Sequence, residues 1–140
     1  SAKEGGDGVG KGTEALLQKA DAELSAHLTT ILGKRGIDAL VLPHAQRLAV
    51  ALLSPDACAF VWDLCLLAGW QHLQPALTAV LISLKEGLRA CTNTKSASAH
   101  LLTAARKVTA AQLQRVLEDH FMDAIRADLN APLPSSALER

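Results

Sequence analysis

Residues 54–70 read Ser54-Pro55-Asp56-Ala57-Cys58-Ala59-Phe60-Val61-Trp62-Asp63-Leu64-Cys65-Leu66-Leu67-Ala68-Gly69-Trp70. This stretch predicts one helix with a defined start and end. The Ser54 side chain can accept a hydrogen bond from the first free N–H groups, and Pro55 suits the first helical position. Gly69 can adopt the left-handed conformation that ends a helix. Because nearly every residue between them is apolar, we expect the helix to be surrounded by others, with Trp62 buried as a core anchor.

The composition predicts an all-α fold. The chain has 140 residues, of which 49% are hydrophobic, and it contains no Tyr, two Phe and two Trp. Leu and Ala, which make up most of the apolar content, favour helices, whereas strands favour β-branched and aromatic residues. We therefore expect a single all-α helical domain of five or six helices over residues 13–130. A flexible Gly-rich tail at residues 1–12 and a flexible C-terminal tail at residues 131–140 would flank it.

Helices are also expected before and after residues 54–69. The apolar spacing predicts them at about 13–32, 37–53, 70–88, 95–106 and 109–125. Thr13 is expected to cap the first, and Gly33–Gly36 to end it. Pro43 should divide the second, because proline lacks an N–H group and clashes with the preceding turn. Thr109 and Gln112 have the spacing of a capping box at the start of the last helix.

The charge balance argues against two classes of partner. Fourteen basic and fourteen acidic residues give a formal net charge of zero, so no basic face for nucleic acid is expected. The apolar run from Ala57 to Ala68 is too short to span a membrane. Cys58 and Cys65 lie about 10 Å apart along one helix, too far for a disulfide bond. With no visible signal peptide, a reducing cytoplasmic location is expected.

The order of these elements resembles the C-terminal half of a TBC domain, the all-helical module of Rab GTPase-activating proteins. The resemblance covers roughly residues 21–126. Its most specific parts are a leucine-rich helix end, a Pro-containing turn, a Trp-Asp pair, and a glycine followed by a long aliphatic helix. In this chain they correspond to Leu48–Leu53, Ser54-Pro55, Val61-Trp62-Asp63, Gly69-Trp70 and Leu73–Leu84.

The chain departs from the family where catalysis is concerned. The catalytic Arg and Gln fingers of the family lie in its N-terminal half, and neither motif is found here. Phe60 also stands where the family usually has Arg. The resemblance therefore implies a non-catalytic interaction module that binds a partner protein such as a small GTPase. The alternatives are a portion of an active Rab GTPase-activating protein whose fingers lie outside this chain, and an unrelated helical scaffold or assembly subunit that docks on another helical subunit.

Other candidate sites have simpler explanations, and no catalytic, cofactor-binding or metal-binding residue is predicted. Gly5–Thr13 resembles the phosphate-binding loop of adenylate kinases, but no strand precedes it and no parallel sheet follows. Cys58, Cys65 and His72 recur every seven residues, a spacing too wide for one tetrahedral metal ion, and His72 is interpreted as a surface histidine. His120 is expected at the edge of the core. Glu118 and Asp119 are expected on a solvated face.

Overall fold

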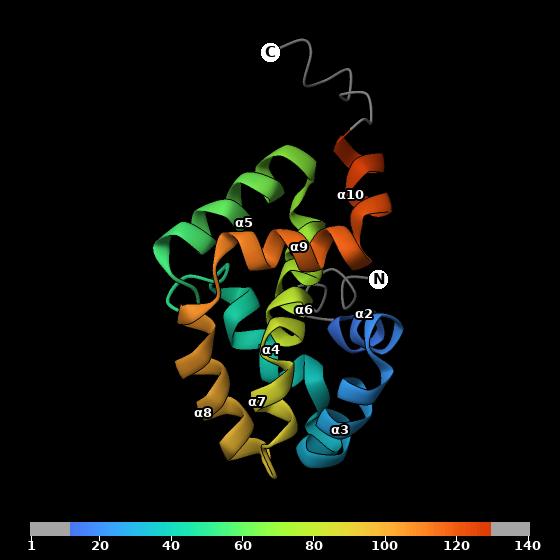
Figure 1. The fold of residues 1–140 in the computed structure, drawn as a ribbon, viewed down its shortest axis with the longest axis vertical. Helices are drawn as coiled ribbons and strands as arrows, with labels where there is room; N and C mark the ends of the chain where they lie inside the picture. The colour runs from blue at the N-terminus through green and yellow to red at the C-terminus, as the bar shows by residue number, and fades with distance from the viewer. Residues whose placement is uncertain (1–11, 130–140) are drawn as a thin grey trace.

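The computed structural model describes residues 12–129, and every regular element in this range is a helix (Figure 1). The predicted all-α fold is confirmed. The tails predicted at residues 1–12 and 131–140 lie outside the described range, apart from Gly12. The elements, in order, are α2 (Thr13–Ala20), α3 (Ala22–Leu32), η1 (Gly33–Arg35), α4 (Gly36–Gln46), α5 (Pro55–Ala68), η2 (Trp70–His72), α6 (Leu73–Ser83), α7 (Lys85–Arg89), α8 (Thr94–Ala104), η3 (Ala105–Lys107), α9 (Ala110–His120) and α10 (Met122–Leu129).

The first expected helix is divided at Asp21. The Asp21 carboxylate accepts a hydrogen bond from the Leu24 N–H at 3.1 Å and caps α3. The chain therefore turns between α2 and α3. The expectation of one continuous helix over residues 13–32 is therefore wrong. Gly12, rather than Thr13, is the residue that precedes α2, and Thr13 is buried as its first residue.

The second expected helix is shorter than its sequence suggests. Pro43 lies inside α4 and does not divide it, contrary to the prediction. The helix ends at Gln46, three residues after Pro43, and the prediction that it reaches residue 53 is also wrong. The next residues leave the helical conformation, with φ values of 55°, 66° and 69° at Leu48, Ala49 and Ala51. This irregular path buries Ala49 and Leu52 in the core, so tertiary packing outweighs the local helix propensity of Leu and Ala.

The centre of the molecule is α6. Figure 1 shows this helix running through the middle of the fold, and it packs against α2, α4 and α9. Its residues are buried on every side over most of its length: Leu73, Ala76, Leu77, Thr78, Ala79, Val80 and Leu81. The helix that is surrounded by others is therefore α6 and not α5, which corrects the expectation drawn from residues 54–69.

The remaining helices follow the predicted order with extra breaks. The long helix expected over residues 70–88 is divided at Leu84, and the last helix is divided at Phe121. The capping box at Thr109 and Gln112 is confirmed, because each side chain bonds the backbone N–H of the other residue. A second capping box, which the sequence analysis missed, starts α8 at Asn93.

Candidate functional site

The start and end of α5 are formed by the residues that the sequence predicts. The Ser54 hydroxyl accepts a hydrogen bond from the Ala57 N–H at 3.3 Å, and Pro55 is the first helical residue. Gly69 ends the helix with a φ of +115°, a conformation that side chains rarely adopt. Local chemistry therefore fixes where α5 lies in the sequence.

The buried side of α5 is made of small residues. Its buried positions are Ala57, Val61, Cys65 and Ala68, which recur at helical spacing and form one stripe. This stripe faces the rest of the molecule, where α5 contacts α6, α9 and α10. Figure 1 shows α5 at the outer edge of the fold, lying along α9. Small side chains permit close packing between helices, and they leave the large ones on the other side.

The outer side of α5 exposes large apolar residues. The exposed fractions are 69% for Leu66, 75% for Leu67, 37% for Trp62 and 41% for Trp70. The prediction that Trp62 is sealed in the core is therefore wrong. The physical reason is that α5 has neighbours on one side only, and the small-residue stripe occupies that side.

Trp62 is held in place by two contacts. Its indole N–H donates a hydrogen bond to the Leu48 carbonyl oxygen at 2.8 Å. Its ring meets the Trp70 ring edge-on, with centroids 6.3 Å apart and planes at 73°. Leu66 lies four residues after Trp62, so these two share one side of α5. Trp70 follows the end of the helix, and its ring contact with Trp62 places it beside them. We call the surface formed by Leu48, Trp62, Leu66, Leu67 and Trp70 the α5 face.

The charges on the outer side of α5 are acidic. Asp56 and Asp63 are both exposed, and the sequence of α5 contains no basic residue. Within residues 12–129, Asp63 has neither an ion pair nor a hydrogen bond through its side chain. The α5 face is thus an apolar surface with a carboxylate beside it, which suits binding rather than catalysis.

Of the cysteine and histidine residues considered as metal ligands, His72 pairs with a carboxylate and the two cysteines are free thiols. His72 is buried, not a surface residue as predicted, and its Nε2 lies 2.5 Å from an Asp128 carboxylate oxygen on α10. Burial raises the pKa of the Cys58 thiol, and it raises that of Cys65 to about 11. No group of three or more potential metal ligands occurs within the described range.

The second histidine considered in the sequence also differs from its expected place. His120 is exposed rather than at the edge of the core, with its ring 6.1 Å from the Phe121 ring at a tilted angle. Glu118 and Asp119 are exposed, as expected for a solvated face. Of the glycine-rich stretch at residues 5–13, the structure describes only Gly12 and Thr13.

The exposure of Leu66 and Leu67 is not predicted from the sequence. The signal that could have found it is the segregation of residue size around the helix: Ala57, Val61, Cys65 and Ala68 share one stripe. That stripe allows the closest approach of a neighbouring helix, and the large residues lie away from it.

No protein-family model matches the chain, and neither a curated protein nor a solved structure matches it. Among residues 12–129, no helix is both long and apolar enough to cross a lipid bilayer.

Proposed function

We propose that this chain is a non-catalytic protein-interaction module that resembles the C-terminal half of a TBC domain and binds a partner protein, such as a small GTPase, through the α5 face. The observation that carries the proposal is the inverted arrangement of α5, in which small residues are buried and large apolar residues are exposed. Contiguous apolar surface rimmed by polar residues is characteristic of interaction sites.

The composition of the α5 face favours a protein as the partner. Tryptophan is among the residues that contribute most to protein–protein binding energy, and this face presents Trp62 and Trp70 together. The hydrogen bond from Trp62 to Leu48 fixes the indole before any partner arrives, which lowers the entropy lost on binding. Such preorganisation is typical of a docking surface.

Charge complementarity indicates which kind of partner surface would fit the α5 face. Asp63 lies on the outer side of α5 between the apolar residues, without a basic neighbour on this helix. A partner helix with an apolar stripe and a flanking Lys or Arg would cover Leu66 and Leu67 and would pair with Asp63. Opposite charges steer encounter and fix register, while the apolar contacts supply most of the affinity.

The proposal is tested with purified Rab GTPases, each loaded with GDP or with a non-hydrolysable GTP analogue, by titration calorimetry. We expect at least one GTPase to bind, and Leu66→Gln to weaken that binding by about tenfold or more, as for a central apolar contact. Leu42→Gln changes an exposed leucine of α4 outside the α5 face and serves as the matched control.

Two results would contradict the proposal. One is the absence of binding to every GTPase in the panel. The other is an equal loss of binding in Leu42→Gln and Leu66→Gln. Light scattering on the same samples distinguishes the scaffold alternative, because a dimer that Leu66→Gln dissociates would assign the α5 face to self-association. GTP hydrolysis is measured in parallel, and acceleration by this chain alone would refute its non-catalytic character.

A further inference from the structure

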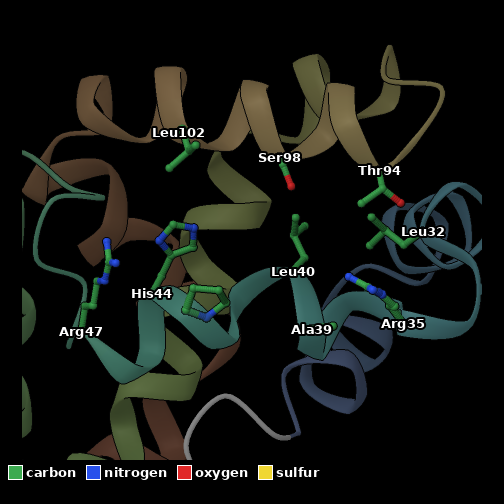
Figure 2. Close-up of a pocket in the computed structure, with 11 residues that line it drawn as sticks. Leu32, Arg35, Ala39, Leu40, His44, Arg47, Thr94, Ser98 and Leu102 are labelled. Carbon is green, nitrogen blue, oxygen red and sulfur yellow. The ribbon is translucent and has the colours of Figure 1, made fainter.

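A groove of about 370 Å³ lies between α4 and α8, on elements that do not form the α5 face (Figure 2). Eleven residues line it, contributed by the end of α3, by η1 and α4, and by α8. None of the eleven carries a carboxylate. The lining therefore combines basic, hydroxyl and apolar side chains, with no negative charge among them.

The positive charges lie at the two ends of this groove. Arg35 directly precedes α4 and Arg47 directly follows it. Figure 2 shows their side chains at opposite ends, with Leu40 and His44 between them. Neither guanidinium has an ion pair or a hydrogen bond with any residue in the range 12–129. Two unpaired guanidinium groups in one groove favour an anionic ligand, since arginine binds carboxylates in a bidentate geometry.

The middle of the groove is apolar with one hydroxyl. In Figure 2 the Leu40 side chain points from α4 toward α8, and the Ser98 hydroxyl points from α8 into the space between the two helices. Leu102 of α8 lies across from His44 and is half exposed. A ligand that fits this groove therefore has negative groups at its ends and an apolar group between them.

The pKa of His44 responds to the charges in the groove. Burial lowers the pKa of its imidazole, and the positive charge of Arg47 lowers it further. The residues of α8 that line the groove are uncharged. A carboxylate that pairs with Arg47 would offset the effect of the guanidinium and raise the pKa of His44.

The separation of the two arginines sets the length of the ligand. They are separated by α4, and a helical rise of 1.5 Å per residue puts their backbones about 18 Å apart. An extended peptide advances about 3.3 Å per residue, so five or six residues cover that span. A single phosphate or carboxylate group would satisfy only one end.

We propose that the α4–α8 groove binds an extended acidic segment of a partner protein, with one carboxylate at Arg35, another at Arg47, and an apolar side chain over Leu40. In this arrangement Arg35 and Arg47 recognise the two carboxylates of the peptide, and Leu40 recognises the apolar side chain between those carboxylates. The Ser98 hydroxyl is placed to bond the peptide backbone.

The test uses the full chain and a fluorescein-labelled synthetic peptide that has two glutamates separated by four residues, with a leucine between them. Binding is followed by fluorescence anisotropy at an ionic strength of about 0.05 M, where charge contacts are weakly screened. We expect Arg35→Ala and Arg47→Ala each to weaken binding by about two- to fivefold, within the range for exposed ion pairs. Arg115→Ala removes an exposed arginine of α9 and should leave binding unchanged.

Two further measurements separate charge recognition from general attraction. The same peptide with glutamine in place of both glutamates should bind about four- to 25-fold more weakly, because two ion pairs are lost. In NMR titrations, the glutamate peptide should raise the pKa of His44. Both arginine side chains are exposed and unpaired, so their substitution leaves the fold intact, which circular dichroism verifies.

The proposal is overturned if the glutamine peptide binds as tightly as the glutamate peptide, or if Arg115→Ala weakens binding as much as Arg35→Ala. It is also overturned if inorganic phosphate at millimolar concentration displaces the peptide completely, since that result assigns the groove to a small anion. Neither variant replaces a residue of the α5 face, and Arg35 is remote from it in the sequence, so failure of the Arg35→Ala experiment is distinguishable from failure of the GTPase-binding experiment.

Discussion

Replacing Ala51 with glycine is expected to stabilise the protein. Ala51 has a φ of +69°, in the left-handed region, and its side chain is exposed. An L-residue in this conformation costs about 1–2 kcal/mol relative to glycine. Glycine gains about 0.4–1 kcal/mol of conformational freedom in the unfolded chain, which opposes the effect. The net expectation for Ala51→Gly is an increase of roughly 0.5–1 kcal/mol in the free energy of unfolding.

The matched control is Ala59→Gly, the same chemical change on the exposed side of α5. Ala59 lies inside the helix, where glycine lowers stability by about 1 kcal/mol relative to alanine. Ala49→Gly provides an intermediate case. Its φ is +66°, but its side chain is fully buried, so relief of strain is offset by about 0.8 kcal/mol for the lost methyl group.

Urea-induced unfolding followed by circular dichroism gives the three free energies of unfolding. The order expected, from most to least stable, is Ala51→Gly, Ala49→Gly and Ala59→Gly. If Ala51→Gly destabilises the protein as much as Ala59→Gly does, then Ala51 does not hold a left-handed conformation. In that case the account of residues 47–53, including the position of Leu48 beside Trp62, is refuted.

Three more predictions concern the α5–α10 region. Hydrogen bonds with Gln71, and then with His72, lower the pKa of the Asp128 carboxyl below its ordinary value of 3.8. The stabilisation that this carboxylate gives to α10 is therefore present above pH 3.8 and is lost as pH falls through the lowered pKa, which NMR of the α10 amides measures. Asp128→Asn should remove this transition. Cys65 has a pKa of about 11, so its thiol should resist alkylation by iodoacetamide at pH 8 until urea unfolds the protein. Mass spectrometry measures the alkylation, and rapid reaction in the native state would contradict the burial of Cys65. Gly69→Ala should lower the free energy of unfolding by about 1–3 kcal/mol, because the φ of +115° at this position strains any residue with a side chain. An unchanged urea midpoint would contradict the left-handed conformation of Gly69.

The features that the sequence predicts correctly depend on residues close together in the chain. The cap at Ser54, the end at Gly69 and the capping box at Thr109 each involve groups no more than four residues apart. The all-α fold follows in the same way from composition, since every segment carries helix-forming residues.

The features that the sequence does not predict depend on distant residues. His72 is buried, and its hydrogen-bond partner Asp128 lies 56 positions away. The turn at Asp21 is stabilised by an ion pair with Lys85, whose Nζ lies 2.7 Å from the carboxylate. The irregular path after Gln46 reflects the burial of Ala49 in the core. None of these long-range partners leaves a local signal in the chain.

The energetics of the α5 face indicate which of its residues a partner has to cover. Full burial of a leucine contributes about 1.5–3 kcal/mol, so Leu66 and Leu67 together offer at most about 6 kcal/mol. Association costs roughly 4–15 kcal/mol in lost freedom of motion. The leucines alone therefore offset only the low end of this cost, so we expect a tightly bound partner to cover Trp62 and Trp70 as well.

In the proposed interaction, the strained segment before α5 would contribute to binding. The Leu48 carbonyl oxygen accepts the hydrogen bond that holds the Trp62 indole, and its direction is set by the left-handed backbone at Leu48 and Ala49. A side chain that is already fixed avoids a loss of about 0.5–1.5 kcal/mol when it is immobilised by a partner. We therefore expect the backbone strain in this segment to be coupled to the proposed affinity of the α5 face, because the strained backbone positions Trp62, on which that affinity would depend.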